Sequence, residues 1–329
     1  MDKIINKITF EPPIKGYLGY AFPLSILFAE GDSFLPWMYS NHNYIMMYGK
    51  KDFSLFNQSD NDWMHGNERV FKKHTVVLPK YILKRNDIVN DLIMGLVEKN
   101  YYIITKSDEY YIPGRRSYMN RHFDHENMVY GFDKTKKIFN IASYTDKGYF
   151  GGTEISFEDY ITALNENEYD DFTLNIVSRY SEFKPKFNAE RCKTLLSYYL
   201  SGCDKEFDLN NVDYYHGIDA QKNLYYYLEY VKDNNMDIDI RYFYYLWEHK
   251  KIMLDRINYM LDNGYVSGSR DEYAEYYDVV KKAEIIKGLN LKYNIIKRET
   301  TIKNMQELIH YIVGAEERIL SKLIKNIIQ

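Results

Sequence analysis

The chain has 329 residues, 45% of them hydrophobic, and a formal net charge of -4. This length is enough for one large or two modest cores, and the hydrophobic fraction excludes wholesale disorder. The charge is not gathered into a basic stripe, so no nucleic-acid partner is expected. No segment approaches the roughly 18 apolar residues of a membrane span, and the start has no signal-like apolar run. We therefore expect a cytoplasmic protein with no membrane partner.

Residues 1 to about 165 are expected to mix helices and strands. A short buried helix is predicted over Pro23–Ala29, because proline suits a first helical turn, where its missing N–H would have no partner. The aromatic segment Trp37–Tyr48 is typical of a strand. Three-to-four-residue apolar spacing predicts a helix over Asp87–Lys99, and Tyr101–Ile104 follows as a strand.

A β-hairpin and a capped helix complete this first half. Asn127–Phe132 and Ile138–Ala142 flank the polar turn Asp133–Lys137, which predicts the hairpin. Ser156 stands three residues before Asp159, a capping-box pattern that predicts a helix start.

From about residue 170 the pattern becomes helical throughout. The predicted helical stretches are Cys192–Leu200, Gln221–Val231, Arg241–Leu261, Tyr273–Leu289 and Asn304–Ile328. The expected fold class is therefore α+β, with a mixed domain over residues 1–168 and a helical domain over residues 169–329.

His125 is the first candidate for chemistry. It stands at the mouth of the hairpin strand and is followed by an apolar run, Gly131, an aromatic residue and Asp133. An imidazole held on a strand can deprotonate a thiol, while a neighbouring residue orients its other nitrogen. His122 is the rival base. A purely structural or surface histidine is the alternative interpretation.

The thiol that such a base would activate is missing from its expected place. A reactive cysteine belongs at the N-terminus of a buried helix, where the helix dipole lowers its pKa and backbone N–H groups can form an oxyanion hole. The apolar pattern favours Ala21 for this position, with Gly19 and Tyr20 as alternatives of register. The chain's two cysteines, Cys192 and Cys203, fall in the helical half and are interpreted as packed thiols in a reducing compartment.

These residues together resemble the papain-like clan, especially its C39-like branch and the N-terminal domain of the butirosin biosynthesis protein H family. The hairpin pattern is carried by His125 and, six residues later, Gly131-Phe132-Asp133. Further stretches resemble amide synthases encoded beside nonribosomal-peptide and thioamide biosynthesis genes. They are Leu35-Pro36-Trp37, Asn43-Tyr44-Ile45, Asp108-Glu109-Tyr110-Tyr111-Ile112-Pro113, Gly148-Tyr149, Ser156-Phe157-Glu158, Tyr215-His216-Gly217-Ile218 and Glu248-His249-Lys250-Lys251.

The resemblance implies a papain-like cysteine-protease scaffold that carries out acyl transfer. An acyl group would leave the phosphopantetheine thioester of an acyl or peptidyl carrier protein for an enzyme cysteine, and a primary amine or diamine would then accept it as an amide. No bound cofactor is implied. A module that binds carrier proteins without catalysis and a peptidase or thioesterase that uses water are the alternatives. Ala21 fits either the replacement of a natural cysteine, which we favour, or a natural pseudoenzyme.

The remaining candidate residues would orient the imidazole or bind the substrate. The residue that orients His125 is expected among Asn140, Ser143 and Asp133, where Asp133 also suits the cap of the hairpin turn. Arg115 and Arg116 are candidates for holding the phosphopantetheine phosphate, since guanidinium suits phosphate. Asp60-Asn61-Asp62 lacks the rest of a calcium loop, so no metal is expected.

Overall fold

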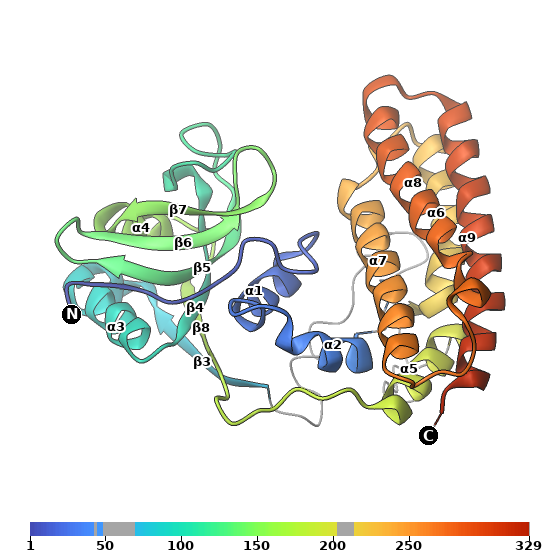
Figure 1. Ribbon diagram of the computed structural model, residues 1–329. Helices are drawn as coiled ribbons and strands as arrows, with labels where there is room; N and C mark the ends of the chain where they lie inside the picture. Colours follow the sequence, from blue (N-terminus) through green and yellow to red (C-terminus); the bar gives the residue numbers. More distant parts are fainter. Residues whose placement is uncertain (43–44, 49–69, 203–213, 329) are drawn as a thin grey trace. The chain divides into compact units, whose positions relative to one another are not determined.

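A computed structural model of the protein describes residues 1–42, 45–48, 70–202 and 214–328 (Figure 1). Its composition, 53% helix and 20% strand with an antiparallel sheet, is that of an α+β protein, as predicted. Within the described ranges no helix is long and apolar enough to cross a membrane. Asp60-Asn61-Asp62 and Cys203, both named above, lie outside the described residues.

The chain divides into two compact units. The first unit takes the described residues of Met1–Asp32 and Met64–Lys184, and the second takes those of Ser33–Trp63 and Pro185–Gln329. This grouping differs from a boundary at residue 168 in two places. Strand β8 (Asp171–Arg179) belongs to the first unit, and helix α2 (Leu35–Asn41) belongs to the second.

The first unit is built on an antiparallel sheet with the strand order β3-β8-β4-β5-β6-β7, and β1 also pairs with β5. Besides β8, its strands are β1 (Lys3–Ile5), β3 (Phe71–Pro79), β4 (Tyr102–Asp108), β5 (Asp124–Asp133), β6 (Ile138–Tyr144) and β7 (Phe150–Ser156). β5 therefore has β4 on one side and β6 on the other. This position decides which residues surround a side chain on β5.

Helices α3 (Asn86–Glu98) and α4 (Phe157–Asn165) share a hydrophobic core with this sheet, and Figure 1 shows α4 beside β6 and β7. Alternate strand residues reach that core, as the two-residue period of a strand requires. They include Ile103, Val129, Phe139, Ile141, Phe172 and Leu174. The short 3-10 helices η2 (Lys80–Lys84) and η3 (Glu109–Tyr111) follow β3 and β4.

Several local predictions for this unit are confirmed. The helix expected over Asp87–Lys99 is α3, and the two expected hairpin strands are β5 and β6, paired antiparallel. The capping prediction also holds, because the Ser156 hydroxyl accepts a hydrogen bond from the Asp159 N–H at 2.9 Å.

Two local predictions are wrong. The first buried helix, α1 (Leu18–Leu27), begins five residues before Pro23, which lies inside it. The segment Trp37–Tyr48 is not one strand: its first part belongs to helix α2, and among its described residues the strand is β2 (Met46–Tyr48). Pro36 stands in the first turn of α2, a position that favours helix initiation over the strand that the aromatic composition indicated.

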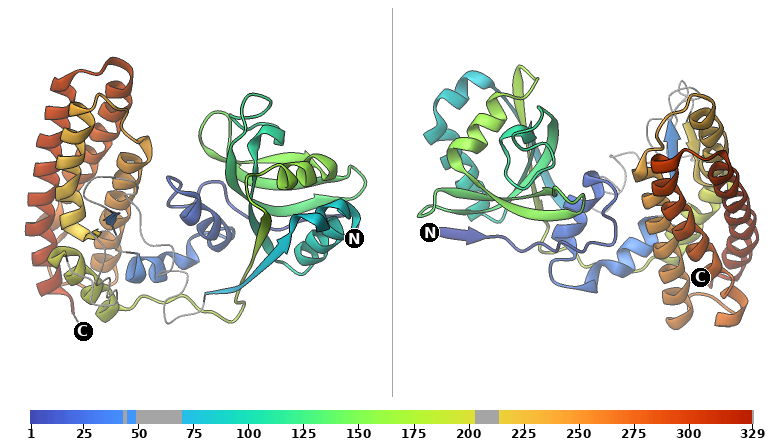
Figure 2. Two further views of the ribbon diagram at one scale, coloured as in Figure 1. Left: turned by 180° about the vertical axis from the view of Figure 1, so that it is seen from behind. Right: turned by 90° about the horizontal axis from the view of Figure 1, so that it is seen from above.

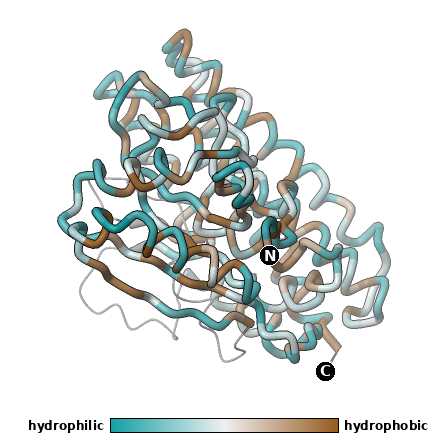
Figure 3. The backbone as a smooth tube through the Cα atoms, turned by 90° about the vertical axis from the view of Figure 1, so that its left-hand side faces the viewer, coloured by the Kyte–Doolittle hydropathy of each residue, from teal (hydrophilic) through white to brown (hydrophobic). Residues whose placement is uncertain are grey.

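The second unit is helical, as predicted, with β2 paired to β9 (Tyr214–His216). Its further helices are α5 (Ala189–Ser201), α6 (Gly217–Asp233), α7 (Ile240–Asp262), the 3-10 helix η4 (Arg270–Tyr273), α8 (Tyr276–Ile296) and α9 (Glu299–Asn326). Helices α6 to α9 run side by side in Figure 1 and Figure 2. Figure 3 shows hydrophobic and hydrophilic residues interspersed along the backbone. In α9 the buried residues Ile302, Met305, Ile309 and Ile312 recur every three or four positions, which is the amphipathic pattern of a bundle helix.

A polar cluster lies in the core of this bundle. Lys250 and Glu316 are both fully buried, and their charged groups are 2.9 Å apart. Tyr199 donates a hydrogen bond to Glu316 at 2.7 Å, and the Gln221 amide donates another at 2.8 Å. Burial lowers the pKa of Lys250 to about 8, against the attraction of Glu316, which acts in the opposite direction. The bundle thus holds a charged pair where apolar packing is usual.

Candidate active site

His125 is held by a carboxylate from the 3-10 helix that follows the neighbouring strand β4. Its Nδ1 lies 2.8 Å from the Oε1 of Glu109. The register explains this contact: Ser107 on β4 faces His125 on β5, and the chain then turns into η3, which places Glu109 beside the imidazole. The Glu109 side chain is 8% exposed and that of His125 is 28% exposed, so the pair is largely shielded from water while the ring keeps access to solvent.

This pairing fixes what the imidazole can do. An ionised carboxylate only accepts hydrogen bonds, so the proton of the neutral ring lies on Nδ1 and the lone pair lies on Nε2. The ring of Tyr144 is stacked on His125 at 5.9 Å with an interplanar angle of 27°, and Phe123 lies 5.3 Å away on a tilted plane. These contacts hold the ring in the orientation of a general base.

A second histidine–carboxylate pair stands next to the first. The Nδ1 of His122 lies 2.5 Å from the Oδ2 of Asp108, and the His122 ring stacks on Tyr110 at 4.5 Å. Burial alone would raise the pKa of Asp108, but hydrogen bonds from His122 and from the backbone N–H groups of Phe123 and Tyr110 outweigh it and lower that pKa. The side chain of His122 is 67% exposed. Both candidate bases therefore have a partner, and His125 is the more enclosed one.

None of the three residues expected to orient His125 occupies that place, and Glu109 takes it instead. Asp133 is eight residues further along β5, roughly 26 Å in an extended strand, where its carboxylate accepts the Lys136 N–H at 3.0 Å and caps the turn. Asn140 is paired with Gly131 towards the same end of the hairpin. The Ser143 hydroxyl donates to the backbone carbonyl of Glu126 at 2.7 Å.

Helix α1 begins at Leu18, three residues before Ala21. Ala21 is fully buried, and its N–H is already used in a bond to the Tyr17 carbonyl at 2.9 Å. The N–H groups left without helical partners at a helix start are those of its first residues, here Leu18 and Gly19. Gly19 is also the only residue of α1 that is not buried. A nucleophile at this helix N-terminus would therefore stand at Leu18 or Gly19 rather than at Ala21.

The segment that leads into α1 is tied to the His125 site. The Tyr144 hydroxyl donates to the carbonyl of Lys15 at 2.8 Å, while the ring of the same tyrosine stacks on His125. Phe22 of α1 packs edge-on against Phe150 of β7 at 6.0 Å. One tyrosine thus contacts both the candidate base and the backbone just before the candidate oxyanion hole.

The two arginines differ from each other. Arg115 is 3% exposed, and its Nη1 donates to the backbone carbonyl of Tyr144 at 2.8 Å. Burial lowers the pKa of this guanidinium to about 10. Arg116 is exposed. Of these two arginines, Arg116 is accessible to a phosphate from solvent. The burial of Arg115 contradicts the predicted role of that residue in phosphate binding.

No nucleophilic side chain was found at the start of α1. Ser25, further along the same helix, is fully buried and donates its hydroxyl to the Phe22 carbonyl at 2.7 Å. Cys192 belongs to the second unit, and burial raises the pKa of its thiol to about 11, which leaves the reactive thiolate scarce at neutral pH. Among the described residues, no group of three or more His, Cys, Asp and Glu side chains is placed to hold a metal ion.

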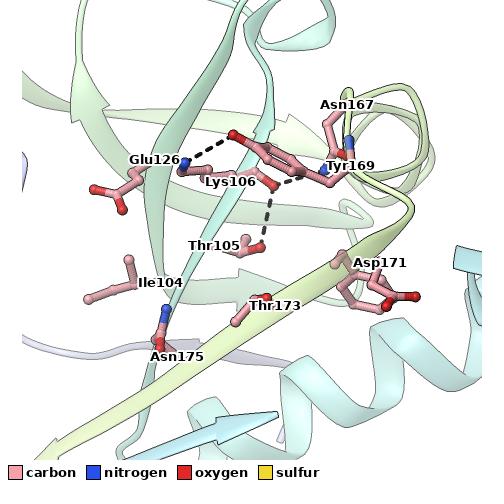
Figure 4. Close-up of a pocket in the computed structure, with 10 residues that line it drawn as sticks. Ile104, Thr105, Lys106, Glu126, Asn167, Tyr169, Asp171, Thr173 and Asn175 are labelled. Carbon is pink, nitrogen blue, oxygen red and sulfur yellow. Dashed lines mark hydrogen bonds between the residues drawn. The ribbon is translucent and has the colours of Figure 1, made fainter. Parts of the chain in front are cut away.

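A pocket of about 290 Å³ opens on the sheet beside this site (Figure 4). The Lys106 ammonium donates to the Tyr169 hydroxyl at 3.1 Å, a bond that raises the pKa of Lys106. The lining residues are Ile104, Thr105, Lys106, Glu126, Asn167, Tyr169, Asp171, Phe172, Thr173 and Asn175. Glu126 follows His125 in β5, and successive strand residues point to opposite faces. The pocket is therefore separate from the imidazole.

Glu109 and Asp108 were not among the site residues predicted from the sequence. A signal for them was present, because this acidic pair stands shortly after the predicted strand Tyr101–Ile104. A scan against protein-family models found no match, and a search of curated proteins found no match either. The resemblance given above therefore depends on the motifs themselves.

Proposed function

We propose that this chain is a cytoplasmic amide-forming acyltransferase of secondary metabolism, built on a papain-like scaffold and similar in activity to amide synthases such as that of closthioamide biosynthesis. It would join an acyl group from a carrier-protein phosphopantetheine thioester to a primary amine or diamine. The observation that supports this most is the contact of Glu109 with His125 Nδ1, because it leaves a shielded Nε2 free to accept a proton.

The chemistry needs one proton acceptor. As the neutral amine attacks the thioester carbonyl, the C–N bond forms, and His125 Nε2 takes the proton that the nitrogen loses. The C–S bond then breaks, and the thiolate of phosphopantetheine leaves and takes up that proton from the imidazolium. Glu109 stabilises the imidazolium between these two steps. General base catalysis of this kind contributes about 10²–10⁴-fold to a rate.

The absence of a thiol from the start of α1 decides between two routes. As the sequence stands, the amine attacks the carrier thioester directly, and the N–H groups of Leu18 and Gly19 are the candidates to bind the carbonyl oxygen. A cysteine placed there would add the covalent step of the cysteine-protease scheme. The overall reaction is the same in both routes.

A second candidate function is a non-catalytic module that binds carrier proteins. It is favoured by one observation, namely that α1 offers only a buried serine and no thiol. Such a protein would bind an acylated carrier protein without consuming its thioester.

The test is product analysis by liquid chromatography and mass spectrometry, with an acyl-pantetheine thioester and a diamine as substrates. We expect amide from the unmodified chain, loss of amide in His125→Gln, and no loss in His310→Gln, which changes an exposed histidine of α9. Free acid in place of amide would indicate a hydrolase. Slow product at the uncatalysed rate from all three proteins would contradict the proposal and favour the binding module.

A further inference from the structure

Arg115 is a buried residue that is connected to the surroundings of His125 through Tyr144 and through Glu109. We infer that Arg115 is a positioning residue that fixes the orientation and tautomer of the His125 imidazole. The inference rests on the proposed role of His125 as a base. The sequence indicated that Arg115 binds a phosphate, but this residue is buried in the connection between β4 and β5.

The first connection runs through Tyr144. The Arg115 Nη1 donates to the Tyr144 carbonyl at 2.8 Å, so it holds the last residue of β6. The Tyr144 ring stacks on His125, and its hydroxyl is bonded to the Lys15 carbonyl. Fixing the Tyr144 backbone therefore fixes the aromatic surface against which the imidazole lies.

The second connection runs through Glu109. The electrostatic attraction between Glu109 and Arg115 acts to keep the guanidinium charged, against the burial that opposes it. The same Glu109 carboxylate accepts the hydrogen bond of His125 Nδ1. Arg115 is therefore bonded to Tyr144 and electrostatically coupled to Glu109, and both of these residues contact the imidazole.

The cost of keeping Arg115 buried supports a functional role. Its Nε and Nη2 atoms are enclosed and have no hydrogen-bond partner among the residues that the structure describes. Each unsatisfied buried donor weakens folding, whereas an apolar side chain of similar length would fill the space without this cost. The bond to the Tyr144 backbone beside His125 gives the buried guanidinium a role that packing alone does not require.

The test is the tautomer of His125, measured by ¹⁵N–¹H correlation NMR on the full chain. A charge-assisted hydrogen bond favours the Nδ1–H form by about tenfold or more, so Glu109→Gln gives the reference for its loss. Arg115→Met is expected to reproduce most of that loss, and Arg115→Lys, which keeps the charge, is expected to retain part of the preference. Arg116→Met, at the exposed neighbour, should leave the tautomer unchanged.

The outcomes separate this inference from the proposed function, because the measurement needs no turnover. An unchanged tautomer in a folded Arg115→Met protein overturns the inference, whether or not amide is formed. If Arg115→Met does not fold, Arg115→Lys is measured instead. This variant lacks the planar guanidinium, so Tyr144 and His125 signals identical to those of the unmodified chain would also overturn the inference. A shifted His125 spectrum in Arg115→Met, together with no amide formation by the unmodified chain, would support the inference and contradict the proposed function.

Discussion

Replacing Lys250 with methionine tests how the helical unit tolerates its buried charges. The substitution leaves the Glu316 carboxylate fully buried, with hydrogen bonds from Tyr199, Gln221 and Tyr276 but without its cation. Removing one partner of a buried ion pair costs about 3–5 kcal/mol. Since typical domains are stable by about 5–15 kcal/mol, we expect a large loss that urea denaturation followed by circular dichroism will resolve at pH 7.

The double variant makes this test specific. Lys250→Met combined with Glu316→Gln removes both charges and keeps an amide for the surrounding hydroxyl groups, so it should cost about 2–3 kcal/mol less than the sum of the two single variants. Lys251→Met is the matched control, because Lys251 is exposed on the same helix, and it should change stability by less than about 0.5 kcal/mol. Additive single variants, or a Lys250→Met protein as stable as the control, would refute the reasoning.

Two further predictions concern pH and the start of α1. The lowered pKa of Lys250 means that the folded chain binds fewer protons than the unfolded chain above about pH 8, so the free energy of unfolding should rise from pH 8 towards the ordinary lysine pKa. This contribution has a slope of up to about 1.4 kcal/mol per pH unit and should be absent in Lys250→Met when both are measured by urea titration. Gly19→Cys should be acylated by an acyl-pantetheine thioester and then lose the acyl mass to a diamine, whereas Ala21→Cys, at a fully buried position, should react at least about tenfold more slowly in intact-protein mass spectrometry. Faster acylation at Ala21 would restore the position that the sequence favoured.

Local chemistry allowed most helices and the hairpin to be predicted. The Ser156 cap and the polar turn at Asp133 each depend on residues within four positions of one another, so the sequence carries the whole signal. The start of α1 was misjudged because Pro23 was taken as a first-turn marker. At the sixth position of the helix, proline loses only the hydrogen bond to the Gly19 carbonyl. This loss is tolerated because Gly19 is the one residue of α1 that is partly exposed.

The partner of His125 could not be predicted in the same way. A strand inside a sheet has two neighbours, and the sequence reveals only the neighbour joined by a tight turn. The residues predicted to orient His125 therefore all belong to the hairpin, with Asp133 at the end of β5 and Asn140 and Ser143 on β6. Glu109 arrives from β4, whose pairing with β5 is fixed by the tertiary fold and not by a hairpin. The burial of Arg115 is likewise a property of the folded loop that no local pattern shows.

The central claim is that Glu109 orients His125 for proton transfer, and the neighbouring pair provides its control. The measurement is the single-turnover rate of amide formation in Glu109→Gln and in Asp108→Asn. Both changes are isosteric, and Asn at position 108 can keep the two backbone bonds that Asp108 Oδ1 accepts. We predict a loss of about 10–100-fold in Glu109→Gln and a change of less than about threefold in Asp108→Asn. A loss confined to Asp108→Asn would contradict the account and assign the base to His122.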